Sequence, residues 1–264
     1  MVGRYRRAMG DEYSGIPTPT HFDEWYAAMA HSSAKDDLVR RHLGLPPEML
    51  SSSLLGWDGV EEITRALRLE TGQVLLDLAC GRGGYGLEVA QRMGADLVGV
   101  DFSPVAVDLA TRNAELLGRP ARFLRGALEH TGLDEDSVDG VMCVDAIQFS
   151  TTPPSAYAEI ARVLRPGGRV ALTSWQVLDP DDESLPLRLR QVDLQTGLLA
   201  AGFEDVEVHQ RPEWLAQERA LWEEAVTVEP GGDETLAALR GEGESVLPGI
   251  DRCLRVIATA AQPA

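Results

Sequence analysis

Cysteine is scarce in this sequence, with three residues among 264. Cys80, Cys143 and Cys253 are an odd number at wide spacings, without a Cys-x-x-Cys pair or a histidine at metal-ligand spacing. Neither a disulfide framework nor a zinc site is indicated, and a reducing compartment, the cytoplasm, is the expected location. The five histidines stand apart along the chain, so we predict no metal site.

Long apolar runs are also absent. No run approaches the roughly 20 residues that a membrane-spanning helix needs, since even the run from Val74 to Cys80 is interrupted by Asp77. Asp11 and Glu12 stand where a secretory signal needs an apolar stretch. We therefore expect neither a membrane-spanning segment nor an export signal.

Basic residues are few compared with acidic ones. Lysine and arginine together number 24 against 42 acidic residues, which gives a formal net charge of −18 at pH 7. Proteins that bind DNA or RNA hold the phosphates with basic side chains, so this balance argues against nucleic acid as a partner. It slightly favours a neutral or cationic small molecule as the substrate. The remaining composition, 44% hydrophobic and 25% charged, is typical of globular proteins.

The patterning divides the chain into two parts. Residues 1–70 show helix patterns around a Pro46-Pro47 break, and we expect them to form an N-terminal helical cap or lid. Over residues 71–264, short apolar runs alternate with helix-length segments, which predicts an α/β core whose parallel sheet has helices on both faces. A helical insertion at about 211–250 is expected over the carboxyl edge of that sheet. The expected strands are 73–79, 96–101, 121–125, 138–144, 168–174, 203–209 and 252–260. The expected helices of the core are 84–94, 104–117, 155–165, 187–201, 212–226 and 233–246, and the helix patterns of the cap lie around 20–43 and 58–68.

A glycine-rich turn follows the first expected strand. The segment Val74–Gly86 reads VLLDLACGRGGYG, an apolar strand that leads into a turn and then a helix. Glycines let the backbone approach a ligand closely, and the first turn of a helix offers free N–H groups, so this turn suits a nucleotide. Taken literally, Gly81-x-Gly83-x-x-Gly86 is a dinucleotide-binding pattern, with Asp101 at the end of the next strand for the ribose hydroxyls.

Asp77, at the end of the first strand, discriminates between two ligands. A dinucleotide brings a pyrophosphate, which a carboxylate at this position would repel. S-adenosylmethionine has no phosphate and carries an ammonium and a sulfonium, so an acid beside the turn suits it, with Asp101 on the ribose. The alternative for Asp77 is structural, a carboxylate that only caps N–H groups of the turn.

With these residues the sequence resembles the class I S-adenosylmethionine-dependent methyltransferases, of the small-molecule and natural-product type. Two departures from the family pattern stand out: Ala79 replaces the first glycine of the turn, and Ala127 replaces the common acidic residue of the adenine segment. The motifs that carry the resemblance are Asp77–Gly83 for the turn, Val98–Ser103 for the ribose segment, Gly126–Glu129 for the adenine segment, Ser137–Asp145 for the fourth strand and Leu164–Gly168 for the turn before the fifth.

The resemblance implies a Rossmann-like, doubly wound sheet of seven strands, six parallel and the last one antiparallel and inserted beside the fifth. It also implies S-adenosylmethionine as the cofactor and S-adenosylhomocysteine as the product. Cys80 and Cys143 lie near the methionine part in this pattern, with buried filler as the alternative for each. The implied cofactor-binding residues are Asp77, Ala79, Cys80, Gly81, Gly83, Asp101, Phe102, Ala127, Leu128 and Cys143.

The acceptor is expected outside the carboxyl ends of the strands, where open parallel sheets bind their ligands. Methyl transfer requires positioning and a dry pocket, and a base only if the acceptor must lose a proton. Asp145 is the candidate catalytic residue because it emerges beside the expected sulfonium position, and His21 in the cap is a second; a loop cap and a packing role are their alternatives. The candidate substrate-binding residues are Gln148, Phe149, Trp175, Trp57 and Tyr13.

The predicted function is methyl transfer to N, O or C of a small organic acceptor in specialised metabolism, by a monomer or homodimer that engages neither membrane nor nucleic acid. One alternative is an enzyme or scaffold on the same fold that holds the cofactor without methylating, for example in a cyclisation. The other is a nicotinamide-dependent oxidoreductase. That class has no use for Asp77, and the single lysine, Lys35, does not form the Tyr-x-x-x-Lys pair of its short-chain members.

Overall fold

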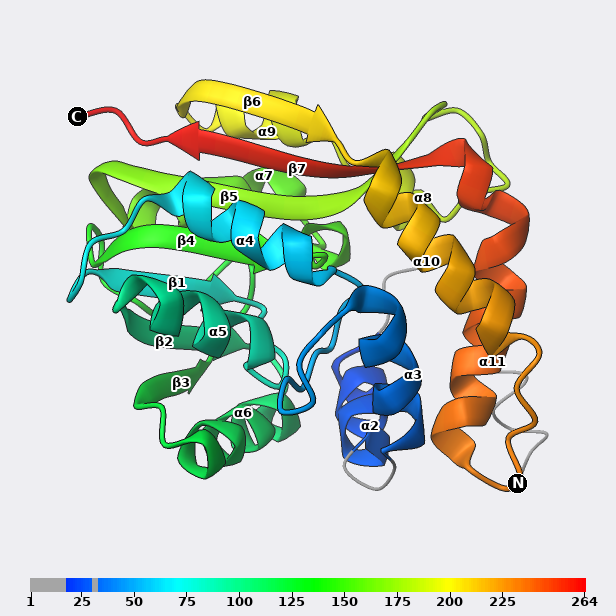
Figure 1. Ribbon diagram of the computed structural model, residues 1–264. Helices are drawn as coiled ribbons and strands as arrows, with labels where there is room; N and C mark the ends of the chain where they lie inside the picture. Colours follow the sequence, from blue (N-terminus) through cyan, green and yellow to red (C-terminus); the bar gives the residue numbers. More distant parts are fainter. Residues whose placement is uncertain (1–17, 30–32) are drawn as a thin grey trace.

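The computed structural model describes residues 18–29 and 33–264. The protein is built around one seven-stranded sheet (Figure 1). The strands are β1 (Val74–Leu78), β2 (Asp96–Asp101), β3 (Ala121–Arg125), β4 (Val138–Val144), β5 (Leu164–Val177), β6 (Glu204–Gln210) and β7 (Cys253–Ala261). Their order is β3-β2-β1-β4-β5-β7-β6, and β7 runs antiparallel to both β5 and β6. The predicted sheet with an inserted antiparallel last strand is confirmed.

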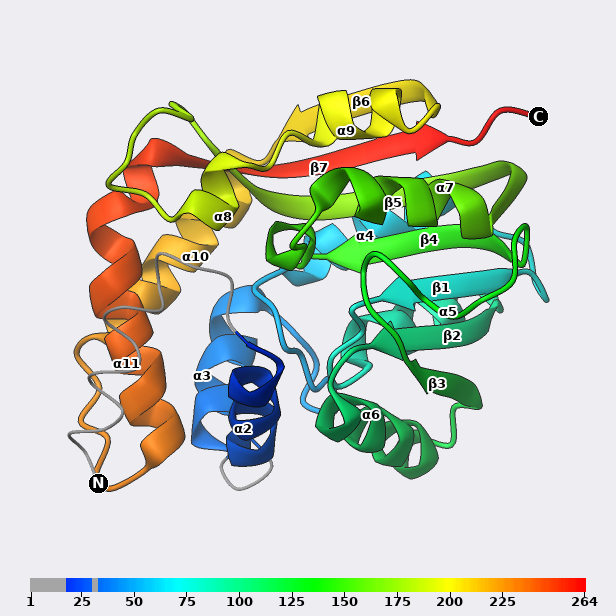
Figure 2. The same ribbon diagram turned by 180° about the vertical axis from the view of Figure 1, so that it is seen from behind.

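Helices cover both faces of the sheet. They are α2 (Pro19–Met29), α3 (Ala34–Leu43), α4 (Trp57–Leu67), α5 (Gly84–Met93), α6 (Pro104–Leu117), η1 (Ile147–Phe149), α7 (Pro153–Val163), α8 (Leu187–Arg190), α9 (Leu194–Ala200), α10 (Pro212–Ala225), α11 (Glu234–Val246) and η2 (Leu247–Arg252). α4 and α5 pack on one face, seen in Figure 1, and α7 and α9 pack on the other, seen in Figure 2. Successive side chains of a strand point to opposite faces, so β1 contributes to the core on both sides of the sheet. Leu75 packs in the core under α4 and α5, whereas Leu76 and Leu78 pack in the core under α7 and α9.

Local signals set most helix ends where the sequence predicts them. The Ser103 hydroxyl accepts a hydrogen bond from the N–H of Ala106 at the start of α6, and Gly118, at φ +63°, ends that helix. The predicted single helix over 187–201 is wrong in one respect: it is two helices, α8 and α9. Asp193 interrupts it by accepting from the N–H of Thr196 as the N-cap of α9.

The N-terminal cap and the late insertion meet beyond the carboxyl ends of the strands. α10 packs on α3, and α11 packs on α2 and α3, as Figure 1 shows. α4 instead packs against α5 and β5, so the helix that the sequence analysis assigns to the cap belongs to the layer on the sheet. No helix within the described ranges is long and apolar enough to cross a membrane.

Candidate active site

A cavity of about 1910 Å³ lies between the carboxyl ends of the strands, the cap and the insertion. Segments that leave β1, β2, β3 and β4 line it on the sheet side, and α2, α3, α10 and α11 close it on the other. Ligand pockets commonly measure about 300–1,000 Å³. The cavity is therefore large enough to hold a cofactor and a second molecule together.

Asp77 lies at the floor of this cavity, at the end of β1, and is only 2% exposed. Its Oδ2 atom is buried without a hydrogen-bond partner among the described residues. Burial, and next the neighbouring Asp101 carboxylate, raise the Asp77 pKa to about 7, and the backbone N–H of Gly86 lowers it in part. A buried carboxylate that lines a cavity and has an unused oxygen is suited to a cationic ligand.

The turn after Asp77 has a left-handed backbone at three positions. Ala79 has φ +61°, Gly81 +53° and Gly83 +77°, so alanine at the family's first glycine position keeps the turn, with strain. The space beside Gly81 is filled by another part of the chain, since a Cβ on Gly81 would lie 2.7 Å from the Ser52 hydroxyl. Ala79 and Cys80 line the cavity, whereas Gly81 and Gly83 do not.

Asp101 is fixed by the backbone at the end of β2. Its Oδ2 accepts from the N–H of Gly81 at 2.9 Å and its Oδ1 from the N–H of Ser103 at 2.9 Å. Burial raises its pKa to about 6, against the lowering effect of these hydrogen bonds. The carboxylate is thus oriented before any ligand arrives, beside the cavity that both Asp101 and Phe102 line.

An aromatic group stands next to Asp101. The Phe22 ring of α2 meets the Phe102 and Phe149 rings edge to face, with centroids 5.3 and 5.2 Å away. Ala127 and Leu128 line the same cavity. The Glu129 carboxylate is committed to the Ser150 hydroxyl and to N–H groups of the following residues. The N–H and the carbonyl of Ala127 pair with His130, which leaves the Ala127 side chain and the Leu128 backbone to contact a flat ring there.

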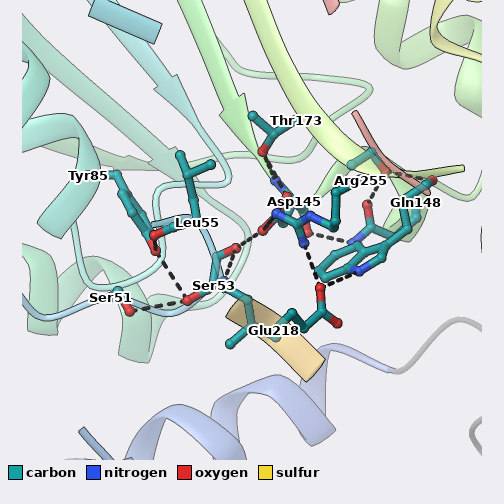
Figure 3. Close-up of polar contacts among 12 residues, drawn as sticks. Ser51, Ser53, Leu55, Tyr85, Asp145, Gln148, Thr173, Glu218 and Arg255 are labelled. Carbon is teal, nitrogen blue, oxygen red and sulfur yellow. Dashed lines mark hydrogen bonds and ion pairs between the residues drawn. The ribbon is translucent and has the colours of Figure 1, made fainter. Parts of the chain in front are cut away.

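Asp145, the predicted catalytic residue, belongs to a buried polar network (Figure 3). One Arg255 nitrogen lies 2.9 Å from each of its carboxylate oxygens, the Thr173 hydroxyl donates at 2.8 Å, and the Ser53 hydroxyl donates to Oδ2. Asp145 has φ +53°, which turns its side chain toward this network. Its charge is already compensated, so the arrangement favours a positioning role over a free general base.

Glu218 of α10 continues the network toward the insertion. It accepts from the indole N–H of Trp175 at 2.8 Å and of Trp222 at 3.1 Å, and lies 3.4 Å from Arg255. Burial raises its pKa, although the Arg255 guanidinium and the two indoles oppose that shift. The guanidinium also stacks on the Trp175 ring at 4.0 Å. One cation therefore serves two buried carboxylates, and both tryptophans are held at the cavity wall.

The predicted site residues divide clearly between the cavity and other surroundings. Cys143 is a wrong prediction, because strand alternation turns it into the core beside Tyr157 of α7. Trp57 is also wrong, since its ring lies under Arg92 of α5 and outside the cavity. Tyr13 lies outside the described residues. The predicted residues that line the cavity are Asp77, Ala79, Cys80, Asp101, Phe102, Ala127, Leu128, Asp145, Gln148, Phe149, Trp175 and His21.

The sequence analysis missed several residues of the site. Phe22 and Lys35 line the cavity from the cap, Glu218 lines it from α10, and Arg255 holds Asp145 from β7. The only sequence signal for Arg255 is a charge inside an apolar strand, in the run CLRVIATAA. Among residues 18–29 and 33–264, no group of three or more metal-binding side chains is placed to hold an ion.

Comparisons with known proteins agree with this geometry. Residues 76–172 match the family model of a methyltransferase domain. Over these residues the chain is similar to methyltransferase domains. The sterol 24-C-methyltransferase of Yarrowia lipolytica is 31% identical over 120 residues, 45% of this chain and 32% of that protein, and that of Gibberella zeae is 30% identical over 134 residues, 50% and 35%. The match thus spans about a third of the length of these curated relatives.

Solved structures of this fold extend over nearly the whole chain. The [4+2]-cyclase SpnF superposes with a TM-score of 0.73 and 21% identity, over 95% of this chain and 99% of that one. Phosphoethanolamine N-methyltransferase 2 of Haemonchus contortus, in complex with S-adenosyl-L-methionine, superposes with a TM-score of 0.72 and 21% identity, over 95% and 61%. The methyltransferase domain match ends within β5, so the cap and the insertion, which supply much of the cavity wall, lie outside it.

Proposed function

We propose that this protein is an S-adenosylmethionine-dependent methyltransferase that methylates N, O or C of a small organic molecule in specialised metabolism. The observation that carries the proposal is the buried Asp77 carboxylate, whose Oδ2 has no partner among the described residues, under a glycine-rich turn and beside a large cavity. A dinucleotide pyrophosphate gains nothing from this acid, whereas a cationic cofactor compensates it.

The residues present fit S-adenosylmethionine. We assign Asp77 and the backbone at Ala79 and Cys80 to its methionine part, Asp101 to the ribose hydroxyls, and Phe102 with Ala127 and Leu128 to the adenine, because all of them line the cavity. When bound, this cofactor supplies an electrophilic methyl group on positive sulfur. Gly81 and Gly83 support the turn through their backbone conformation, and Gly81 anchors Asp101 by its N–H.

The protein's contribution to the reaction is placement and exclusion of water. Phe149, Trp175 and Trp222 form apolar wall, and Asp145 and Glu218 are held by Arg255 rather than free to accept a proton. Gln148 donates to the Asp145 carbonyl and accepts from Ser174, so its amide is also fixed. The site thus favours acceptors whose methyl-accepting atom is nucleophilic without the help of a strong base.

A second candidate is an enzyme on this fold that does not transfer the methyl group. The structural match to SpnF over almost the full length of both chains supports a cyclisation as the second candidate reaction. The cavity would then hold the cofactor as a structural element and fold a flexible substrate over the apolar wall.

One experiment separates the two candidates. Purified protein is incubated with S-adenosylmethionine and a panel of small amines, phenols and enols, and the reaction is followed by mass spectrometry. Methyl transfer predicts S-adenosylhomocysteine and a product heavier by one CH₂ in equal amounts. Conversion of a substrate without change of mass, with S-adenosylmethionine intact, supports the cyclisation instead.

The three cysteines are buried and free, which supports the proposal that the protein works in the cytoplasm. We propose a small molecule as its partner, with neither membrane nor nucleic acid involved.

A further inference from the structure

Lys35 occupies a unique place in the composition and in the cavity. It is the only lysine among 264 residues, in which every other basic side chain of the 24 is an arginine. It stands on α3, is 8% exposed, and lines the cavity. An ammonium withdrawn from water at this depth normally has a counter-ion.

No hydrogen bond or ion pair of the described residues reaches the Lys35 ammonium. Its Nζ lies over the Trp25 ring of α2, 4.6 Å from the centroid. The adjacent Asp36 carboxylate is committed to both terminal nitrogens of Arg82, at 2.8 and 2.9 Å. Glu242 of α11 acts on Lys35 only through space, and burial lowers the Lys35 pKa.

Apart from Glu242, apolar side chains of α2 and α11 line the cavity on the side of Lys35. Trp25 and Met29 of α2 line it on one side and Ala238 of α11 on the other. A buried cation that has no hydrogen bond or ion pair among the described residues, next to apolar side chains, matches a molecule with an apolar body and one anionic group.

We propose that Lys35 binds an anionic group, a carboxylate or a phosphate, on the apolar molecule that enters this cavity. The proposal rests on the proposed function only in identifying that molecule as the methyl acceptor. It differs from what the net charge of −18 suggests, because a contact inside a cavity depends on the nearest charges. Of the described carboxylates that act on Lys35, Glu242 does so only through space and Asp36 is bonded to Arg82.

The test compares decanoate, decyl phosphate and decanol as probes of the full-length protein, by calorimetric titration. The unaltered protein is expected to bind at least one of the two anions roughly 10-fold more tightly than decanol, the gain of one charge-assisted hydrogen bond. Lys35→Met removes that preference, and Lys35→Arg keeps most of it. Arg112→Met, which removes an exposed charge on α6, is the matched control and leaves the preference unchanged.

Glu242→Gln distinguishes ligand binding from a tether between α3 and α11. If Lys35 serves a ligand, removal of the competing Glu242 carboxylate strengthens anion binding. If Lys35 only holds α11, Lys35→Met and Glu242→Gln lower the melting temperature alike and the preference among probes does not change, which overturns the proposal. Failure of the unaltered protein to bind either anion better than decanol overturns it as well.

A second readout uses the single lysine directly. Reductive methylation with ¹³C-formaldehyde labels one side-chain amine, whose resonance is expected to shift with the preferred anion and not with decanol. S-adenosylhomocysteine binding is measured on the same proteins. Lys35→Met is expected to leave S-adenosylhomocysteine binding unchanged. If the unaltered protein does not bind S-adenosylhomocysteine, the proposed function is refuted, whereas the anion preference is judged by the probe titrations alone.

Discussion

Arg255 and Asp145 lie 110 positions apart in the chain and form an ion pair from which solvent is almost absent. A terminal nitrogen of Arg255 lies 2.9 Å from both carboxylate oxygens, and the two side chains are 0% and 1% exposed. The pair ties the inserted strand β7 to the exit of β4. It holds Asp145 at the cavity wall.

Arg255→Met is expected to lower the free energy of unfolding by about 3–5 kcal/mol, because Asp145 and Glu218 remain buried without their shared cation. Urea unfolding measures this. The control is Arg219→Met on α10, whose partner Asp251 is 83% exposed, and it costs less than about 1 kcal/mol. Equal losses in the two variants would contradict the network.

Asp77→Asn is expected to be more stable than the unaltered ligand-free protein, by an amount that grows as the pH rises. The folded pKa is raised from 3.8 to about 7, so ionisation costs stability that is intact below pH 4 and is lost progressively up to pH 7. The variant escapes this cost, by up to about 4 kcal/mol above pH 7. Thermal unfolding from pH 4 to 8 tests it. Asp96→Asn, at an exposed position, should show no such trend, and a pH-independent gain in Asp77→Asn would refute the account.

Ala79→Gly is expected to gain about 1 kcal/mol, since glycine adopts φ +61° without strain. The same substitution in a regular helix, Ala237→Gly in α11, is expected to cost about 1 kcal/mol. Chemical denaturation of both variants measures the difference. Loss of stability in Ala79→Gly would mean that this turn is not strained.

Arg82→Met is expected to loosen the cap. Arg82 joins the glycine-rich turn to Asp36 of α3 and donates to the Ser51 carbonyl. Hydrogen exchange of residues 33–55 should rise at least about tenfold, the effect of losing roughly 1.4 kcal/mol of local stability. Arg119→Met, which breaks the contact to Glu88 alone, should leave exchange in the cap unchanged.

The sequence predicts the part of the site that is encoded locally. The strand, turn and helix around Asp77, and Asp101 at the end of β2, depend on neighbours a few residues away, and they lie where expected. Cys143 is misplaced by a single position in strand alternation: Val144 and Asp145 line the cavity and Cys143 faces α7.

The remaining part depends on contacts between distant segments. Trp175, Glu218 and Arg255 meet only because β7 inserts beside β5 and α10 folds over the sheet edge. The cap presents the same difficulty, since Lys35 enters the cavity from a helix whose packing on α10 and α11 no local pattern indicates.

The most direct test of the central claim is calorimetric titration of ligand-free protein with S-adenosylhomocysteine, NADH and NADPH, alongside Asp101→Ala. We predict micromolar binding of S-adenosylhomocysteine alone, weakened at least about 30-fold by Asp101→Ala through the loss of the ribose contact. Binding of a nicotinamide cofactor, or unchanged affinity in Asp101→Ala, would contradict the assignment of Asp77 and Asp101 to S-adenosylmethionine.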